Sequence, residues 1–344
     1  MYETSIWSKE TERIMSEQRP LHIVMTPVRN EAWVLRAFLE ATSRWADYII
    51  IADQMSTDGS REIAKAYPKV ILIDNKNSEF NEAERQSMLV AKAREVAAGR
   101  DTLLWGLDAD EVFSANFRET EDWKRIMNSK PGAVFWFWWA QLTYDKRHYY
   151  DPKTPFPWLF HDDGKEPHGN YVRNMHSMRI PYPLDEHDMT YVKDFRVLHL
   201  GTAPLNRIRA KERFYIFVDW QVNQRPPYSL YSYVNSNAYP DELFELPQEW
   251  LYTKEKDGWD MWDYVELDET HCWMDDYIYE RLNKYPMSTL AKLPIWTPEF
   301  MSYYHIADPR PWYVRGVHAY LAHAQSHGNS LIVRAINKML KKVH

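Results

Sequence analysis

The acidic run Asp108-Ala109-Asp110-Glu111 directly follows an apolar stretch at residues 102–107. An apolar stretch of this length is typical of a buried strand, and a buried environment expels carboxylates unless a partner offsets their desolvation. Divalent cations prefer hard oxygen ligands, so we predict that this run binds a divalent cation. The alternative is a strand that stops at a solvated acidic turn, which is the better interpretation of an isolated Asp-x-Asp.

The chain before this run alternates between short apolar stretches and amphipathic ones. The apolar stretches predict strands, and apolar side chains at helical spacing predict helices between them. We expect strands at 21–26, 48–52, 69–73 and 102–107, and helices at 31–44, 61–67 and 82–97. This alternation is typical of βαβ units, and it predicts an α/β fold with a mainly parallel sheet.

Polar residues follow three of these strands at their carboxyl ends. They are Thr26-Pro27, Asp53 and the run from Asp108 to Asp110. Ligands of parallel sheets bind beyond the carboxyl ends of the strands, so we expect these three segments to line one crevice. The loop after the first strand contains neither Gly-x-Gly-x-x-Gly nor Gly-Lys-Ser/Thr, which disfavours a dinucleotide-binding or P-loop protein.

The composition predicts a soluble, cytoplasmic protein of one large or two modest domains. The 344 residues carry a formal net charge of −7, so no overall basic field attracts nucleic acid or anionic lipid. Cys272 is the only cysteine, which excludes an intrachain disulfide and suits a reducing compartment. Residues 1–20 lack the apolar core of a secretion signal, and the longest apolar stretch, 133–140, is too short for a transmembrane segment.

Four segments, taken in order, resemble the motifs of family 2 glycosyltransferases. They are Thr26–Glu31, Ala52–Ser60, Asn81–Gln86 and Leu107–Glu111. The Asp-x-Asp alone is a weak signal, but four motifs in order at matching spacings are strong. The resemblance is good over residues 20–115 and loose beyond them.

The resemblance implies a GT-A fold, in which a mainly parallel central sheet is flanked by helices. It divides the chain into an N-terminal extension (1–19), a catalytic domain (20–215) and a mostly helical C-terminal region (216–344). The catalytic domain would hold a nucleotide-sugar-binding half (20–115) and an acceptor-binding half (116–215). Family members transfer a sugar from a nucleotide-diphosphate sugar to an acceptor hydroxyl, usually with inversion and with Mn²⁺ or Mg²⁺. For this chain the resemblance favours a UDP-sugar donor and a glycan or glycoconjugate acceptor.

The resemblance also implies a role for each matching residue. Asp53 would face the base or ribose, Asp108 would hold the ribose or the metal, and Asp110 would bind the metal. Glu111 is expected to be structural. Contacts with the nucleotide-sugar would come from Thr26, Pro27, Arg29, Glu31, Asp53, Arg85 and Asp108.

Several of these roles have simpler alternatives. Asp53 could be a turn or cap acid, Asp58 is expected to cap a helix, and Arg85 could pair with a neighbouring glutamate. Relatives often carry a second acid after the position of Asp53, where this chain has Gln54. An amide both donates and accepts hydrogen bonds, so the identity of the base stays open.

His199 lies in a short strand-like stretch, and a basic segment, Asn206–Tyr215, follows it. Several GT-A enzymes complete their metal or diphosphate site with a histidine from this part of the chain. The resemblance therefore implies His199 as a third metal ligand, with Arg207 and Lys211 near the diphosphate. The alternative is a histidine satisfied inside the core.

An inverting transfer needs a general base that takes the proton of the acceptor hydroxyl. Glu186 and Asp188 are the first candidates and Asp162-Asp163 the second, although proline and glycine near both clusters also fit solvated loops. For the acceptor we expect Trp136, Trp138 or Trp139 of an aromatic strand at 133–140 to stack on a sugar ring or a base, with Trp136 and Trp138 first and the rings of the other face in the core.

Three other functions compete with glycan transfer. Transfer to a modified base in DNA keeps the chemistry, but the negative net charge argues against it. A nucleotidyltransferase would need a Gly-rich, Arg-containing loop after the first strand, which is missing, and intact Asp108 and Asp110 argue against an inactive sugar-binding module. The C-terminal region adds no recognised motif, and we expect helices there at 235–251, 275–285 and 313–340.

Overall fold

The computed structural model describes residues 19–165, 177–183, 189–234, 239–268 and 271–326. These residues form two compact units. The first contains the chain up to Leu142 together with Lys146–Leu200 and Phe244–Glu266. The second contains Thr143–Asp145, Gly201–Leu243 and the chain from Leu267 onward.

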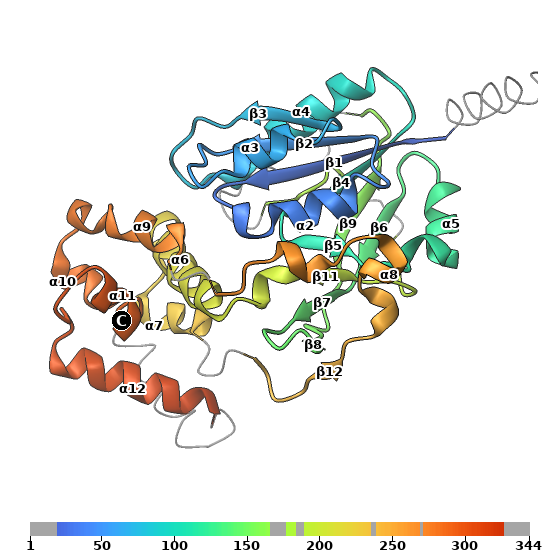
Figure 1. Cartoon of the computed structure of the whole chain (residues 1–344). Helices are drawn as coiled ribbons and strands as arrows, with labels where there is room; N and C mark the ends of the chain where they lie inside the picture. The colour runs from blue at the N-terminus through green and yellow to red at the C-terminus, as the bar shows by residue number, and fades with distance from the viewer. Residues whose placement is uncertain (1–18, 166–176, 184–188, 235–238, 269–270, 327–344) are drawn as a thin grey trace, which may run out of the picture. The chain divides into compact units, whose positions relative to one another are not determined.

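A seven-stranded sheet is the centre of the first unit (Figure 1). Its strand order is β10-β6-β9-β4-β1-β2-β3, and β3, β2, β1 and β4 are parallel, as predicted. β9 is antiparallel to both β4 and β6. The strands are β1 (Leu21–Val28), β2 (Tyr48–Asp53), β3 (Val70–Asp74), β4 (Thr102–Gly106), β6 (Val134–Phe137), β9 (Phe156–His161) and β10 (Met189–Tyr191).

Helices connect the parallel strands where the sequence predicted them. They are α2 (Ala32–Thr42), α3 (Ser60–Lys65) and α4 (Glu82–Ala97), the last with the predicted bounds. The N-cap residues of α2 and α3 are Glu31 and Gly59, but Asp58 binds the start of both helices: its Oδ2 accepts a hydrogen bond from the Ala32 N–H and its Oδ1 accepts one from the Ser60 N–H. The parallel strands joined by helices are those of the predicted α/β fold.

The two faces of the sheet bury different kinds of side chain. Alternate β1 residues such as Ile23 and Met25 belong to an aliphatic cluster with Leu89 of α4. Their neighbour His22 lies on the opposite face, because side chains alternate along a strand. There its ring is stacked on Trp105 and Trp123, at centroid distances of 5.9 and 5.4 Å. Both faces are covered, so the edge that remains for ligands is the carboxyl end of the parallel strands.

A second sheet of five strands, in the order β12-β8-β7-β11-β5, completes the first unit. The prediction of a single aromatic strand at 133–140 is wrong. The strand is interrupted at Trp138, and the chain continues from β6 of the large sheet into β7 of this second sheet. An irregular pairing of β6 with β9 between Phe135 and Trp136 precedes the break, and such irregularities bend a strand. The strands are β5 (Glu111–Phe113), β7 (Trp139–Leu142), β8 (His148–Tyr150), β11 (Val197–His199) and β12 (Phe244–Glu245).

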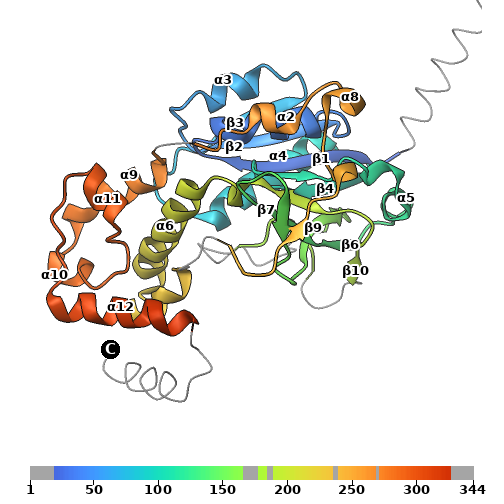
Figure 2. The same cartoon turned by 60° about the horizontal axis from the view of Figure 1, so that its bottom comes forward.

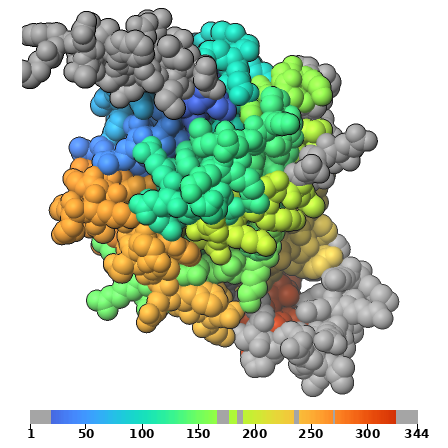
Figure 3. Space-filling model, turned by 90° about the vertical axis from the view of Figure 1, so that its right-hand side faces the viewer, coloured from blue at the N-terminus to red at the C-terminus, as the bar shows by residue number. Residues whose placement is uncertain are grey.

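A segment far along the chain, Phe244–Glu266, returns to the first unit. Its strand β12 pairs with β8, and the Glu266 N–H donates to the Trp33 carbonyl of α2 at 2.9 Å. Figure 2 shows its helix α8 (Lys254–Asp257) beside α2, and Figure 3 shows the same segment in orange on the surface next to blue and green atoms. The division of the structure therefore differs from a boundary at residue 216. The helix predicted at 235–251 is wrong where the structure describes it, because β12 and a 3₁₀ turn (Gln248–Trp250) occupy those residues.

The second unit is helical, as expected for the C-terminal region. α6 packs against α9, and Arg213 of α6 makes a buried bidentate ion pair with Asp275 of α9 at 2.6 and 2.8 Å. The helix predicted at 275–285 ends early, and the chain continues as a 3₁₀ turn, Leu282–Lys284. None of the helices in the described ranges is long and apolar enough to cross a membrane. The helices are α6 (Leu205–Asn223), α7 (Pro227–Leu230), α9 (Trp273–Tyr279), α10 (Met287–Leu290), α11 (Pro298–Tyr303) and α12 (Trp312–Ser326), and the first unit adds α5 (Glu121–Met127).

Acidification should destabilise the first unit through His22. Burial and the charges of Arg19 and Arg118 together lower the pKa of His22 to about 4, although the Asp47 charge acts in the opposite direction. An unfolded histidine titrates near pH 6.5, so between these values the unfolded chain binds the proton and the folded chain does not. The free energy of unfolding should therefore fall by up to about 3 kcal/mol as the pH drops from about 6.5 to about 4.

Urea denaturation across this pH range measures the effect, with the variant His22→Phe as the comparison. Phenylalanine keeps a ring between the tryptophans but cannot titrate, so the variant should lose a smaller part of its stability on acidification. Burial also lowers the pKa of His318 in the second unit to about 4, but both proteins keep this residue, so the difference between them isolates His22. An equal pH dependence in wild type and His22→Phe would contradict the prediction.

Candidate functional site

The carboxyl ends of the parallel strands bring the predicted donor-site segments together. In the sheet register Val28 at the end of β1 lies beside Asp53, and Asp53 lies beside Asp74 at the end of β3. The run that begins at Asp108 follows β4, the other neighbour of β1. Three of the four motifs therefore meet at one edge because β2, β1 and β4 are adjacent and parallel.

The loop after β1 is bound to the loop after β2 by hydrogen bonds. The Ser56 hydroxyl accepts from the Asn30 N–H at 2.8 Å, and the Asn30 side-chain oxygen accepts from the Thr57 N–H at 2.8 Å. The Ser60 hydroxyl accepts from the Glu31 N–H at 2.9 Å. Of the predicted nucleotide contacts here, Thr26 is fully buried, whereas Pro27, Arg29 and Glu31 are half-buried.

Asp53 is buried at the centre of this edge. Its Oδ2 accepts hydrogen bonds from the Arg61 guanidinium at 2.6 Å and from the Ser56 N–H at 3.2 Å. Its Oδ1 is buried and has no hydrogen-bond partner within the described part of the chain. A buried carboxylate oxygen without a donor is costly, so this atom is suited to accept a hydrogen bond from a ligand.

Gln54 and Arg85 are engaged in local contacts. The Gln54 side-chain amide donates to the carbonyls of Asn77 and Glu79 at 2.7 and 3.0 Å, so it holds the loop after β3. Arg85 lies 3.8 Å from Glu82 on α4, which is the simpler alternative for this residue. Its Nε is buried without a partner, so the ion pair leaves part of the guanidinium unsatisfied.

Glu111 is fully buried and accepts four hydrogen bonds. The donors are the indole N–H groups of Trp139 and Trp158, each at 2.9 Å, the backbone N–H of Asp108 at 2.9 Å and the Arg179 guanidinium at 2.7 Å. Burial raises the pKa of the Glu111 carboxyl, and the Arg179 charge opposes that rise. Its oxygens face inward to these donors, which agrees with the structural role expected for this residue.

Arg179 joins Asp108 to Glu111. Its Nη2 donates to the Asp108 Oδ2 at 2.5 Å, while its Nη1 donates to Glu111. The two carboxylates hold the pKa of Arg179 above its ordinary value although burial acts in the opposite direction. A guanidinium thus occupies the position next to Asp108 where the sequence predicted a metal ion.

Asp110 and His199 form a separate pair. His199 at the end of β11 pairs in register with Gln141 of β7, and its Nδ1 lies 2.5 Å from the Gln141 side-chain oxygen. Its Nε2 lies 3.2 Å from the Asp110 Oδ2, and its ring is stacked on Trp139 at a centroid distance of 5.3 Å. An Nδ1–H that donates to Gln141 leaves the Nε2 lone pair directed toward Asp110.

The three ligands predicted for the metal do not come together as one group. Within the described ranges, no three or more His, Cys, Asp or Glu side chains are arranged to hold a metal ion. The reason is that Arg179 pairs with Asp108, which leaves Asp110 and His199 as the two convergent donors. The sequence did not predict Arg179 as a site residue. It belongs to no recognised motif and lies some 70 positions from its partner carboxylates.

Of the three tryptophans considered for the acceptor, Trp139 lies at the acidic run. Trp139 and Trp158 donate their indole N–H groups to Glu111. The Trp139 ring also contacts the Phe156 ring, at a centroid distance of 4.4 Å. Trp136 instead packs against the aliphatic core of the large sheet. Trp138 sits at the break between β6 and β7, where its carbonyl accepts from the Val197 N–H. The break at Trp138, invisible in the alternating pattern, decides which rings reach the acids.

Other predicted residues lie elsewhere. Glu186 and Asp188 lie outside the described residues. Asp162 pairs with Arg94 at 2.9 Å and donates its backbone N–H to the Thr102 carbonyl, at the opposite end of β4 from the acidic run. Arg207 and Lys211 lie on α6 of the second unit, where the buried Arg207 guanidinium donates to the Cys272 sulfur at 3.7 Å.

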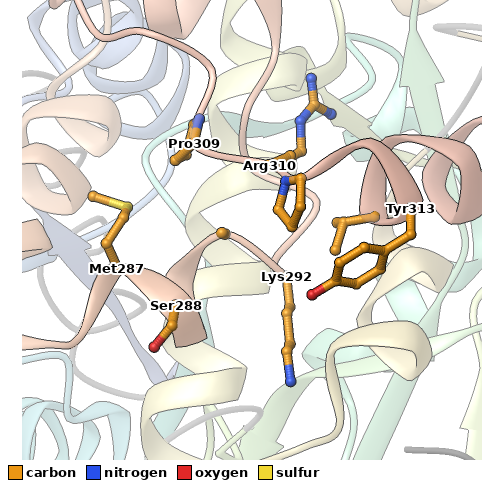
Figure 4. A pocket seen from close by; sticks show the side chains of 9 residues that line it. Met287, Ser288, Lys292, Pro309, Arg310 and Tyr313 are labelled. Carbon is orange, nitrogen blue, oxygen red and sulfur yellow. The ribbon is translucent and has the colours of Figure 1, made fainter.

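A cavity of about 310 Å³ lies wholly within the second unit, between α10 and the start of α12 (Figure 4). Its lining includes Lys292, Arg310 and Tyr313 but no acid or histidine. In Figure 4 the charged ends of Lys292 and Arg310 point in opposite directions, and Arg310 already makes a bidentate pair with Asp308. This cavity lacks convergent polar groups, so the edge that bears Asp53, Asp110 and His199 is the candidate site.

Solved structures resemble parts of the chain only distantly. They include a mycobacterial protein (15% identity, 38% of this chain and 44% of that chain, TM-score 0.27). A 4-diphosphocytidyl-2C-methyl-D-erythritol synthase matches with 14% identity over 42% of this chain and 76% of its own, at a TM-score of 0.31. Glucosyl-3-phosphoglycerate synthase from Mycobacterium tuberculosis, in complex with Mn²⁺, uridine diphosphate and glucosyl-3-phosphoglycerate, matches with 15% identity over 38% and 46%, at 0.26.

The chain spans less than half the length of the two mycobacterial proteins. Likenesses this distant say nothing about the donor or acceptor of this chain. No curated protein matches it.

The sequence also matches a family model, that of "Glycosyl transferase family 2", over residues 23–174. The matched residues include all four motifs and the parallel strands that bring three of them to one edge. The part of the chain from residue 23 to residue 174 therefore matches the glycosyltransferases of family 2.

Proposed function

We propose that the chain transfers a sugar from a nucleotide-diphosphate sugar to an acceptor hydroxyl, with a divalent cation held by Asp110 and His199. A glycan or glycoconjugate is the proposed acceptor and inversion the proposed outcome, both on the family's pattern alone. The observation that supports the metal-dependent reaction is the Asp110–His199 pair at the carboxyl edge of the parallel strands, in a chain that matches family 2.

The chemistry of this pair fits Mn²⁺ or Mg²⁺. The Nε2 lone pair of a neutral His199 and the Asp110 carboxylate converge at 3.2 Å, an arrangement that is unfavourable unless a proton or a cation lies between them. Gln141 binds the other ring nitrogen, and metal-bound histidines in proteins usually donate that nitrogen's proton to such an oxygen. Such cations commonly bind to one or two protein ligands and complete their coordination with water and substrate phosphates.

Different residues at this edge would bind the metal and the nucleoside. When bound, the cation would stabilise the negative charge that develops on the leaving diphosphate. Asp110 and His199 hold it in place, and Trp139 supports the His199 ring from one side. Asp53 orients the nucleoside through its unpartnered Oδ1, while Arg61 fixes the other oxygen of the same carboxylate.

Metal-dependent nucleotide binding is the first test. Saturating UDP with Mn²⁺ should raise the melting temperature, because a ligand at about 100 times its Kd stabilises the folded state by about 2.7 kcal/mol. The rise should disappear in Asp110→Asn and shrink in His199→Ala, since each removes one of the two convergent donors. Thermal shift assays with UDP, GDP, ADP and CDP, with and without Mn²⁺, measure this and identify the base.

The chain offers a matched control in a second Asp–His pair. Asp276 lies 2.8 Å from His271 in the second unit, so Asp276→Asn breaks the same kind of contact away from the proposed site. This variant should retain the full Mn²⁺-dependent shift. No shift with any nucleotide diphosphate, or an equal shift in Asp110→Asn, would refute the proposed metal role.

Nucleoside recognition by Asp53 is the second test. Asp53→Asn preserves the shape of the side chain but removes the charge and half of its acceptor capacity, so we expect UDP affinity to fall about tenfold, or about 1.4 kcal/mol. Isothermal titration calorimetry measures it. Asp74→Asn is the control, because it removes the other partner of Arg61 while leaving Asp53 intact. A similar loss in both variants would mean that Asp53 acts only through Arg61.

A further inference from the structure

We propose that Arg179 is an internal counter-ion that competes with the divalent cation for Asp108, so that metal and nucleotide diphosphate bind cooperatively. The proposal rests on the proposed function, since it concerns the same donor site. It makes Arg179 a positioning residue that exchanges one anionic partner for another.

Arg179 is held by two carboxylates and two tryptophans. Its two terminal nitrogens bond to different carboxylates, at 2.5 Å to Asp108 and 2.7 Å to Glu111. The guanidinium carbon lies 6.0 and 5.7 Å from the ring centres of Trp139 and Trp158, close enough for cation–π attraction. Charge-assisted bonds of this kind are among the strongest polar contacts in proteins, so Asp108 is occupied until something replaces it.

The backbone around Arg179 is built for this position. Gly106 at the end of β4 lies directly against it: a Cβ on Gly106 would be 2.7 Å from the Arg179 Cβ and 3.0 Å from its carbonyl oxygen. The first distance is shorter than real Cβ contacts and the second is tight, so a side chain at residue 106 would force the Arg179 segment away from the strand end. The close approach places the guanidinium next to the acidic run without any motif around Arg179 itself.

The charges explain why a competition arises. Asp108, Asp110 and Glu111 carry three negative charges and Arg179 one positive charge, so the cluster has a formal charge of −2 while His199 is neutral. Glu111 is fully buried and keeps its donors, whereas the Asp108 side chain is 34% exposed. Asp108 is therefore the partner that Arg179 can release.

A nucleotide diphosphate supplies the replacement partner. A guanidinium has five N–H donors, and the Arg179 side chain is 25% exposed, so it can turn a donor toward phosphate oxygens while it stays bonded to Glu111. Release of Asp108 then adds a carboxylate oxygen to the Asp110–His199 pair. Each ligand thus favours the state that binds the other, which is the condition for reciprocal coupling.

The test measures Mn²⁺ affinity from the electron paramagnetic resonance signal of free Mn²⁺, with and without UDP. In the wild type UDP should tighten Mn²⁺ binding at least about tenfold, a coupling of about 1.4 kcal/mol. Arg179→Met removes the charge but keeps an apolar chain against the tryptophans. It should tighten Mn²⁺ binding without UDP about tenfold, weaken UDP binding, and lose most of the coupling.

A second variant guards against misfolding, because Arg179→Met leaves the buried Glu111 without its cation. Gly106→Ala displaces Arg179 by steric contact and leaves every charge in place, so it should shift Mn²⁺ affinity in the same direction. Arg94→Met is the matched control: it breaks a similarly buried Arg–Asp pair, with Asp162, at the other end of β4. It should leave Mn²⁺ binding and coupling unchanged.

The outcomes separate this proposal from the proposed function. If Mn²⁺ binding depends on Asp110 but neither folded variant tightens it in the absence of UDP, Arg179 does not compete and only this inference fails. Equal Mn²⁺ affinity of the wild type with and without UDP also overturns it. If the wild type binds no Mn²⁺ under either condition, the proposed metal role fails as well.

Discussion

The buried carboxylate of Glu111 is the interaction on which the candidate site depends. Isolated burial of such a charge costs several kcal/mol, and here four donors compensate it. The donors come from separate parts of the first unit: β7, β9, the turn after β4 and the segment that carries Arg179. One side chain therefore ties the large sheet to the small one and fixes the acids beside it.

The turn that Glu111 closes separates its two neighbouring acids. The Glu111 N–H donates to the Asp108 carbonyl at 3.0 Å while the Glu111 carboxylate accepts from the Asp108 N–H, so the turn is bonded in both directions. Asp108 then meets Arg179, and Asp110 meets His199, whose successor Leu200 donates its N–H to the Asp110 carbonyl. A removal of Glu111 should therefore disturb both neighbours, whereas a change at Asp108 or Asp110 affects one side of the site.

The local sequence pattern predicted the strands and helices correctly where the residues within an element determine its structure. β1 to β4 and helices α2, α3 and α4 lie close to their expected bounds, because apolar periodicity and short turns specify them without reference to distant residues. The pattern failed where a distant partner decides the outcome. The aromatic stretch at 133–140 divides between two sheets, and residues expected in a helix before Leu251 form a strand that pairs with β8.

The sequence by itself determined that parallel strands end in polar motifs, that these motifs share one edge, and that Asp53 and Asp110 lie there. It could do so because a strand and the residues that follow it are contiguous, and parallel strands end on the same side. Only the tertiary structure decided the partner of each acid. Four side chains from separate segments contact the acidic run and His199: Arg179, Gln141, Trp139 and Trp158. The sequence does not indicate which distant residue a charged group or an indole will contact, because folding brings the two together.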